Sequence, residues 1–203
     1  MLLNQDELEK LSNLVREIES KTDAELVLVL CRRADNYVYA PNLLAAILAM
    51  LTPLVSLYWP FWLDLIDLVY LQAIIFALLA LIFRIPILMQ LLVPKRTKRY
   101  RASNVAMRQF LQQSVHTTSR NLGLLIFVSE FERYVEIVAD HGLKEKIHNS
   151  FWAEAVNDAL PLLKKKQSFE AFLRVLEKVG STLETEFPAT GQKQELPDHV
   201  IVI

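Results

Sequence analysis

Two long uncharged segments in the middle of the chain constrain its fold more than any other feature. The segments "LLAAILAMLTPLVSLYW" (43–59) and "LVYLQAIIFALLALIF" (68–83) contain no charged residue, and eight residues separate them. Each is slightly shorter than the roughly 20 residues that cross a bilayer, and apolar neighbours can extend both. The pattern predicts a transmembrane helical hairpin over residues 42–93, and a pair of buried helices in a soluble core is the alternative.

The residues around the hairpin predict its orientation. Tyr58, Trp59 and Trp62 would form an aromatic belt at one interface, and Pro53 should kink the first span. The connecting loop contains acidic residues and no base, whereas "KRTKRYR" (95–101) contains five bases in seven residues. The positive-inside rule therefore predicts that the loop lies outside and that both termini and the folded domain are cytoplasmic.

The basic segment is also a candidate binding site. It contributes five side chains that could contact anionic lipids, although a topology signal alone is the other interpretation; they are Lys95, Arg96, Lys98, Arg99 and Arg101. We expect the lipid bilayer as a partner. We expect no nucleic acid, because the formal net charge is −1 and only Tyr100 interleaves the bases.

The polar flanks predict one discontinuous domain, formed by residues 1–40 and 95–188, with a tail over 189–203. The single cysteine, Cys31, ends an apolar run and excludes an internal disulfide, which fits a buried thiol in a reducing compartment. The first forty residues lack the basic start and apolar core of a cleavable signal peptide. Neither flank holds a core alone, so we expect them to fold together.

Hydrophobic periodicity predicts the elements of this domain. An amphipathic helix is expected over 5–20, with Asn4 and Glu7 spaced as a capping box. Further helices are expected over 103–117, with Met107, Phe110, Leu111 and Val115 inward, and in the C-terminal third, where Pro161 should end or bend one and Ser168 should cap the last. Strands are expected over 25–30, 122–128 and 134–140, the last two as a hairpin. The predicted class is α/β, a small mixed sheet sandwiched by helices, with the membrane hairpin inserted.

The ordered set of these pieces resembles a known family. "VREIESKTDAELVLVLCRRADNY", the apolar hairpin, "HTTSRNLGLLIFVSEFERYVEIVADHGL", "FW" and "EKVGSTLETEFP" are similar to the TPM-domain family, in its short, membrane-inserted bacterial branch. The resemblance covers residues 5–188 and is most specific over 116–142. It implies an α/β sandwich with a small central sheet, in a bacterial inner membrane. Some relatives are described as acid phosphatases, and others bind divalent metal through acidic loops at one end of the sheet.

The resemblance also points to particular residues. Asp140 and Gly142 match the family's loop after the third strand, Asp158 falls on the following helix, and Asp35 follows the first strand. Where longer relatives have Asp-Asn-Gly before their second strand, this chain reads "RNLG" (120–123).

The stretch "ADHG" (139–142) allows three interpretations: a structural turn, a hard-cation site, or a catalytic acid or base. A site for Ca²⁺ or Mg²⁺ needs several oxygen ligands. The carboxylates that could supply them are Asp140, Asp158, Asp35 and Glu154. Elsewhere, His116 could orient Ser119 as a nucleophile, but a histidine at a helix end is the other reading. The apolar end of the tail could pair with the sheet edge, dock in a partner or remain disordered.

Two functions follow as hypotheses. The first is an interaction or assembly module at the cytoplasmic membrane face, which would bind a protein partner or a second copy and could also bind a divalent metal. The second is a phosphatase-like hydrolase that uses an acidic site around Asp140.

Overall fold

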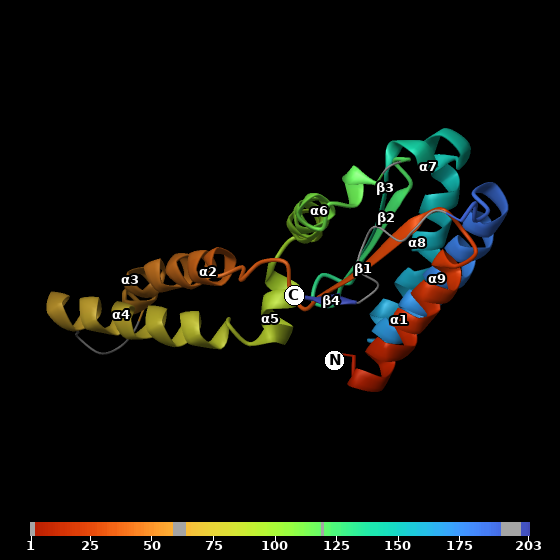
Figure 1. The fold of residues 1–203 in the computed structure, drawn as a ribbon. Coiled ribbons are helices and arrows are strands. Elements are labelled where there is room, and N and C mark those ends of the chain that lie inside the picture. Colours follow the sequence, from red (N-terminus) through yellow and green to blue (C-terminus); the bar gives the residue numbers. More distant parts are fainter. Residues whose placement is uncertain (1–2, 59–63, 119, 192–199) are drawn as a thin grey trace. The chain divides into compact units, whose positions relative to one another are not determined.

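The computed structural model describes residues 3–58, 64–118, 120–191 and 200–203. The chain divides into two compact units, one formed by Met1–Ala34 with Arg99–Ile203 and the other by Asp35–Lys98. Figure 1 labels the elements along the chain. The first unit therefore combines segments from both sides of the second.

A four-stranded mixed sheet forms the centre of the first unit. Its strands, in the spatial order β3-β2-β1-β4, are β3 (Tyr134–Ala139), β2 (Gly123–Ser129), β1 (Glu25–Cys31) and β4 (Ile201–Val202). β1 is parallel to β2 and to β4, whereas β3 runs antiparallel to β2. The connection from β1 to β2 is a crossover, because the two strands are parallel, and the predicted β2–β3 hairpin is confirmed. The mixed α/β class is confirmed with them.

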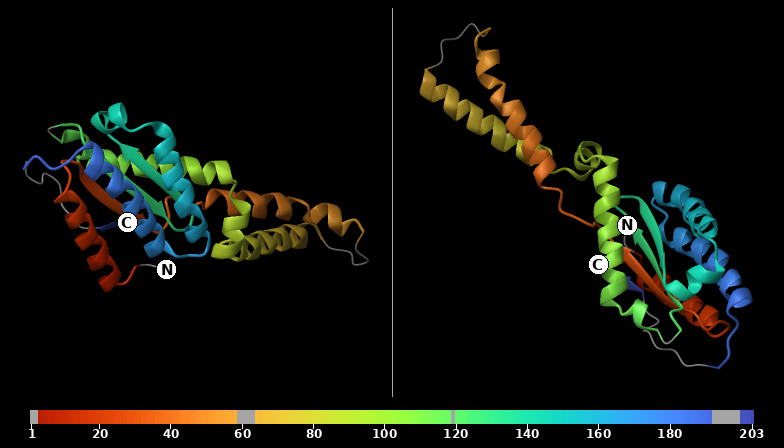
Figure 2. Two further views of the ribbon diagram at one scale, coloured as in Figure 1. Left: turned by 90° about the vertical axis from the view of Figure 1, so that its right-hand side faces the viewer. Right: turned by 90° about the horizontal axis from the view of Figure 1, so that it is seen from above.

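Helices cover both faces of this sheet, as Figure 2 shows. On one face, even-numbered β1 residues such as Leu26 and Leu28 pack with α1 (Gln5–Glu19), α8 (Asn149–Lys164) and α9 (Ser168–Glu186). On the other face, Val27, Val29 and Cys31 pack with the α6 residues Ala102, Ala106 and Phe110. Every residue of β1 and β2 is consequently buried, which is why both read as continuous apolar runs.

The helix α1 begins as the sequence predicts. The Asn4 side chain accepts a hydrogen bond from the Glu7 N–H, and the Glu7 carboxylate accepts one from the Asn4 N–H, each at 2.8 Å. The capping box is therefore confirmed. Leu11, Val15 and Ile18 form the buried face of the helix.

Helix α6 (Lys95–Gln112) differs from the prediction in its bounds and its buried face. It begins eight residues before the expected start at 103, and a short 3-10 helix, η1 (Val115–Thr117), follows it. Met107 and Leu111 are 50% and 54% exposed, so their predicted inward position is wrong. The residues Ala102 and Ala106 lie against the sheet instead, because small side chains let the helix backbone approach closely. Phe110 and Val115 are buried as expected.

Two details of the C-terminal helices differ from what the sequence suggested. Pro161 lies inside α8, which continues to Lys164, so this proline does not end the helix. Ser168 is the first residue of α9 and does not cap it, since Gln167 occupies the N-cap position without a side-chain hydrogen bond. The Ser168 hydroxyl instead donates to Glu130 Oε1 at 2.8 Å, which ties α9 to the β2–β3 turn. The short helix α7 (His141–Lys146) connects β3 to α8.

The end of the tail pairs with the sheet edge. The Ile203 N–H donates to the Leu30 carbonyl and the Arg32 N–H donates to the Ile203 carbonyl, both at 2.9 Å. Of the three possibilities for "VIVI", the edge strand is therefore the one observed.

The second unit is a helical hairpin. The first arm consists of α2 (Tyr39–Met50) and α3 (Thr52–Ser56), and α4 (Leu65–Ile82) forms the second arm, followed by the short helix α5 (Pro86–Leu92). The helix is interrupted at Leu51, two residues before Pro53, where the sequence predicted a kink. Two stretches, Tyr39–Ser56 and Leu65–Ile82, are long and apolar enough to cross a membrane, by length and composition. Of the expected aromatic belt, Tyr58 is 92% exposed, whereas Trp59 and Trp62 lie outside the described residues.

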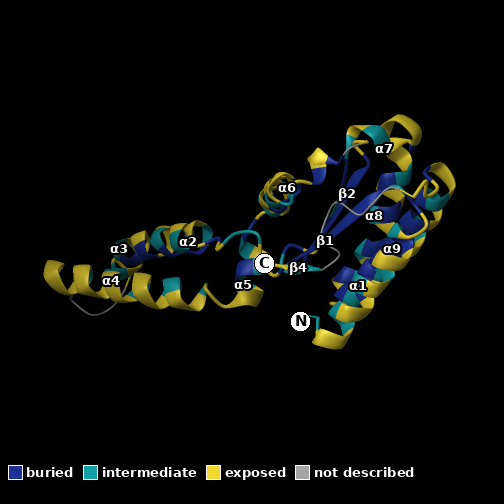
Figure 3. Ribbon diagram, in the orientation of Figure 1, coloured by how far each residue is buried: buried dark blue, intermediate teal, exposed yellow. Residues whose placement is uncertain are grey.

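The two units differ in how far their apolar side chains are buried. Figure 3 shows buried strands in the first unit and mostly exposed or half-buried helices in the hairpin. Helix α4 has no buried residue, although nearly all of its side chains are apolar.

Candidate functional site

The residues of "ADHG" lie where β3 ends and where β1 and β2 begin, which we call the Asp140 end of the sheet. The pairing of Ala139 with Leu124 sets this register. The Asp140 N–H donates to the Gly123 carbonyl at 2.9 Å, and Asp140 Oδ1 accepts from the His141 N–H at 2.7 Å. Asp140 thus ends a strand and caps α7, as a structural turn requires.

Gly142 holds this turn against the loop that precedes β2. Its N–H donates to the Asn121 carbonyl at 3.0 Å. A Cβ atom at position 142 would lie 2.8 Å from the Arg120 carbonyl oxygen and 2.9 Å from the Asn121 carbonyl oxygen. Both are backbone atoms that cannot move aside easily, so this close approach requires glycine.

One atom of the turn has no such structural role. Asp140 Oδ2 is buried and accepts no hydrogen bond from the residues that the structure describes. A desolvated carboxylate oxygen without a donor is unfavourable unless water or an ion contacts it. The turn therefore has one acceptor that is available to an occupant.

A second cluster, of polar and charged side chains, lies at the same end of the sheet. Asp23, two residues before β1, forms an ion pair with Arg120 and accepts two hydrogen bonds from Thr190, from the N–H at 2.8 Å and from the hydroxyl at 2.7 Å. Burial alone would raise the pKa of Asp23, but the Thr190 bonds and the Arg120 charge outweigh it and lower the pKa. The Arg120 guanidinium is therefore already paired with a carboxylate of the same domain.

Glu154 and Asp158 are brought together elsewhere, between α8 and α9. Lys178 Nζ lies 2.9 Å from Asp158 Oδ2 and 3.3 Å from Glu154 Oε2. The hydrogen bond from Lys178 lowers the pKa of Asp158, and the same bond raises the pKa of Lys178. A lysine ammonium thus occupies the position that a cation ligated by these two carboxylates would take.

Asp35 belongs to the opposite end of the sheet. β1 ends at Cys31, which pairs with Ser129 at the end of β2. The Ala34 N–H, one residue before Asp35, donates to the Glu132 carboxylate at 3.1 Å beyond that end. Because β3 runs antiparallel, Asp140 lies at the other end of the strands.

The four predicted carboxylates therefore do not form one site. Across residues 3–58, 64–118, 120–191 and 200–203, no group of three or more His, Cys, Asp or Glu side chains is arranged to hold a metal ion. His141 lies 3.1 Å from Glu145 on the surface, and the His148 ring accepts from the Ser150 N–H at the start of α8. Asp140 lies apart from the other three predicted carboxylates, so this set does not supply the several oxygen ligands that were expected for a hard cation.

The pair His116 and Ser119 was the predicted nucleophile site. His116 is exposed in η1, with its ring 6.1 Å from that of Phe110, while Ser119 lies outside the described residues.

The five bases of the lipid-binding prediction lie in the first two turns of α6. Lys95, Arg96, Arg99 and Arg101 are exposed, whereas Lys98 is half-buried. Lys98 Nζ donates to the Gln90 carbonyl near the end of α5 at 2.7 Å. This lysine therefore also joins two helices.

A half-buried acidic group on β3 was missed from the sequence. Glu136 lies on the face of β3 that α6 covers, and its Oε1 accepts from the Ser103 hydroxyl at 3.1 Å. Its Oε2 is buried without a hydrogen-bond partner among the described residues. Burial raises the pKa of Glu136, and burial together with the Glu136 charge raises the pKa of Tyr134 to about 12. The alternating pattern of β3 predicts on which face of the sheet Glu136 lies. Only the position of α6 shows that this face is covered.

Comparison with known proteins finds a family model that matches part of the chain. Residues 88–182, from α5 into α9, match the family model described as the TPM domain. No curated protein matches the sequence. The fold is similar to the NMR structure of the BA42 protein from the psychrophilic bacteria Bizionia argentinensis sp. nov., with a TM-score of 0.60 and 16% identity over 100% of this chain and 96% of that chain. At this identity the likeness shows the fold alone. Residues 88–182 therefore match the TPM domain, and the fold of the chain is similar to that of the BA42 protein.

Proposed function

We propose that the chain is a TPM domain anchored in a bacterial inner membrane by its helical hairpin, and that it serves there as an interaction or assembly module. The domain would lie at the cytoplasmic face, with the α3–α4 loop on the outside. Its partner would be another protein or a second copy of the chain.

The observation that carries the membrane proposal is the contrast between α4 and α9. α9 has one polar and one apolar face and buries eight of its residues. α4 is far more apolar along its 18 residues and buries none. Exposing such a surface to water is costly, at roughly 25 cal/mol per Å². A bilayer removes that cost, because lipid chains cover the surface.

The start of α6 supports the orientation. Lys95, Arg96, Arg99 and Arg101 follow the hairpin directly and are exposed. Basic side chains beside a span favour the cytoplasmic side and attract anionic headgroups, each by about 1 kcal/mol.

Matched pairs of substitutions test the anchor. Ile74 and Leu78, four residues apart on α4, are 56% and 55% exposed, and Met107 and Leu111, four apart on α6, are 50% and 54% exposed. Changing Ile74 and Leu78 to Asp should release the chain from membranes washed at alkaline pH, because each charge in a bilayer core costs about 2.5–3.5 kcal/mol. The same changes at Met107 and Leu111 should leave the chain in the membrane. Equal behaviour of the two double variants would contradict the proposal.

One observation favours a second candidate function. The buried Oδ2 atom of Asp140 has no partner in the described chain, as in a site that an occupant completes. A phosphatase-like hydrolase would use this carboxylate. The test is hydrolysis of p-nitrophenyl phosphate by the full chain with Ca²⁺, Mg²⁺ or Zn²⁺, compared with Asp140→Asn. Activity that the substitution removes would support the hydrolase, and no activity with any of the ions would favour the module.

A further inference from the structure

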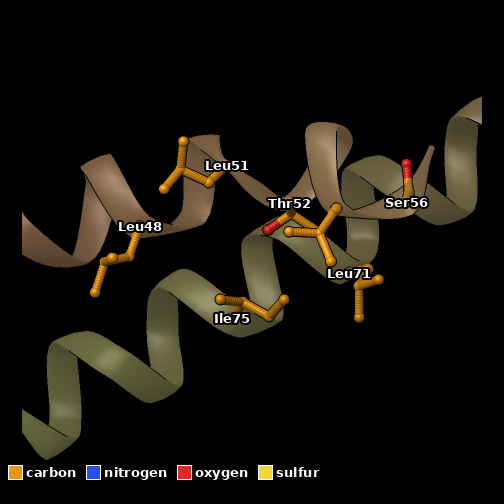
Figure 4. Close-up of a pocket in the computed structure, with 7 residues that line it drawn as sticks. Leu48, Leu51, Thr52, Ser56, Leu71 and Ile75 are labelled. Atoms are coloured by element: carbon orange, nitrogen blue, oxygen red, sulfur yellow. The ribbon is translucent and has the colours of Figure 1, made fainter. Parts of the chain in front are cut away.

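The hairpin contains a groove of its own, which Figure 4 shows in close-up. The groove lies between α2–α3 on one side and α4 on the other, and its volume is about 430 Å³. Its lining is almost entirely apolar and is formed by Leu48, Leu51, Thr52, Val55, Ser56, Leu71 and Ile75. All of these residues belong to the Asp35–Lys98 unit.

The break in the first arm explains why the groove opens at this level. Pro53 has no N–H, so the regular hydrogen bond to the carbonyl of Ala49 cannot form. The helix tightens instead, with the Leu51 N–H donating to the Leu48 carbonyl at 3.1 Å, and α3 restarts at Thr52. On the turns before the break, Ala45 and Ala49 are buried. The arm is therefore closely covered at Ala45 and Ala49, and the hollow extends along the arm from Leu48 across the break to Ser56.

Thr52 gives the groove a polar group. The residue is only 8% exposed, no hydrogen bond joins its hydroxyl to the described parts of the chain, and its oxygen is not fully buried. In Figure 4 the Thr52 oxygen points into the space between the helices. Ser56 differs, because its hydroxyl donates to the Pro53 carbonyl at 2.7 Å. In a bilayer, a hydroxyl that opens into an apolar groove without a partner among the described residues can donate a hydrogen bond to an atom of a ligand.

The position of Thr52 along the arm indicates which kind of ligand atom could reach its hydroxyl. Thr52 lies four residues before the end of α3, hence about 6 Å from it along the helix axis. The 18-residue span Tyr39–Ser56 is about 27 Å long, close to the roughly 30 Å of a hydrocarbon core. In a bilayer, Thr52 would thus lie just inside the interface on the loop side. The ester carbonyls of acyl lipids lie near that interface, above their apolar chains.

We propose that this groove binds one acyl chain of a membrane lipid, and that the Thr52 hydroxyl donates a hydrogen bond to the ester carbonyl of that chain. The inference rests on the proposed function, in which the hairpin crosses the membrane. The surroundings favour an acyl chain as the occupant, since Leu54, Ile74 and Leu78 next to the groove are also exposed and apolar. A bilayer presents acyl chains to all of this surface.

The test uses the full chain in nanodiscs that contain phosphatidylglycerol with a diazirine in one acyl chain. After irradiation, mass spectrometry locates the labelled residues. We expect labels concentrated on the groove lining. Ile75→Trp fills the groove and should reduce this labelling at least tenfold, whereas Ile74→Trp, at the exposed neighbouring position, should leave it unchanged. Leu71→Phe is a second filling variant, and phosphatidylcholine with the same acyl probe should give the same pattern.

The hydroxyl is tested separately. Thr52→Val keeps the shape and removes the donor, so it should lower labelling by about two- to tenfold, while Thr52→Ser should retain it. With an ether-linked probe, which lacks the carbonyl, Thr52→Val should have no effect. Labels spread evenly over α4, or equal effects of Ile75→Trp and Ile74→Trp, would overturn the proposal. Cross-links from the groove to a second copy of the chain would overturn it in favour of self-association.

The two proposals fail in different ways. A chain that alkaline washing removes from membranes contradicts the membrane anchor itself. A chain that remains in the membrane but shows no preferred labelling of the groove contradicts only the lipid site.

Discussion

Thr190 donates two hydrogen bonds to the Asp23 carboxylate, one from its N–H at 2.8 Å and one from its hydroxyl at 2.7 Å. The contact joins the segment that follows α9 to the segment that precedes β1, 167 residues apart. Arg120 pairs with the same carboxylate. One buried acidic group therefore ties together three distant segments at the Asp140 end of the sheet.

We predict that Asp23→Asn lowers the free energy of unfolding by about 1–3 kcal/mol, the range for hydrogen bonds to a charged group. The Asp23 side chain is only 5% exposed, so solvent screens these bonds weakly. Urea denaturation measures the loss, followed through Trp152 fluorescence in a background where Trp59 and Trp62 are Phe. Glu177→Gln, on the exposed side of α9, is the control and should change little.

The same carboxylate predicts a pH dependence. Its pKa in the folded chain is lower than in the unfolded chain, where it is near 3.9. The stabilisation is therefore present above pH 4 and is lost as the pH falls through the folded pKa. Below that value, the wild type and Asp23→Asn should be about equally stable. A difference between them that persisted unchanged at low pH would contradict this account.

Glu136 should have the opposite pH dependence. Burial raises its pKa in the folded chain, so its contribution to stability is greatest below the unfolded pKa and decreases as the pH rises through the folded value. Glu136→Gln removes the buried charge and can still accept the hydrogen bond from Ser103. Relative to the wild type, we expect Glu136→Gln to raise the free energy of unfolding more at pH 7 than at pH 4. Urea denaturation at both pH values measures the difference. Destabilisation at pH 7 would show that the charged form is favoured.

Substitution by alanine should change the stability of the chain differently at two glycines. A Cβ at Gly123 would lie 2.0 Å from the Val115 carbonyl oxygen, a backbone atom, so Gly123→Ala should cost about 3 kcal/mol or prevent folding. A Cβ at Gly180 would contact the end of the Ile18 side chain at 2.9 Å, which can move. Alanine is also favoured over glycine within a helix by about 1 kcal/mol. Gly180→Ala should therefore stay within about 1 kcal/mol of the wild type in the same assay.

Charge reversal at the start of α6 tests its role at the lipid surface. Changing Lys95 and Arg96 to Glu should reduce the fraction of chains inserted in the predicted orientation, because the cytoplasmic flank loses its bases. Lys164 and Lys165, an exposed basic pair at the end of α8, provide the matched control. Protease protection in sealed vesicles measures the orientation. Equal protection of both double variants would assign no topological role to the bases of α6.

The sheet could be predicted because its signals are strong and local. Continuous apolar runs gave β1 and β2, and the alternating run with its short turn gave β3. The two residues of β4 carry no comparable signal, and their pairing depends on a strand far away in the sequence. The buried face of α6 was mispredicted because large apolar side chains were favoured over Ala102 and Ala106, which allow the close approach.

The candidate site was predicted only in part. The turn at Asp140 follows from local residue preferences. Its relation to Asp35 follows from topology, since an antiparallel β3 places the two residues at opposite ends of the strands. The pairing of Lys178 with Glu154 and Asp158 depends on how α8 and α9 pack, which periodicity alone does not specify.

Thiol labelling tests the central claim, a hairpin that crosses the membrane with the domain inside. In a Cys31→Ser background, Asp64→Cys reports the start of α4 and Glu145→Cys reports the exposed surface of α7. A membrane-impermeant maleimide added to intact spheroplasts should label Asp64→Cys at once and label Glu145→Cys only after the membrane is opened. Labelling of Glu145→Cys in intact spheroplasts, or protection of both positions until opening, would contradict the account.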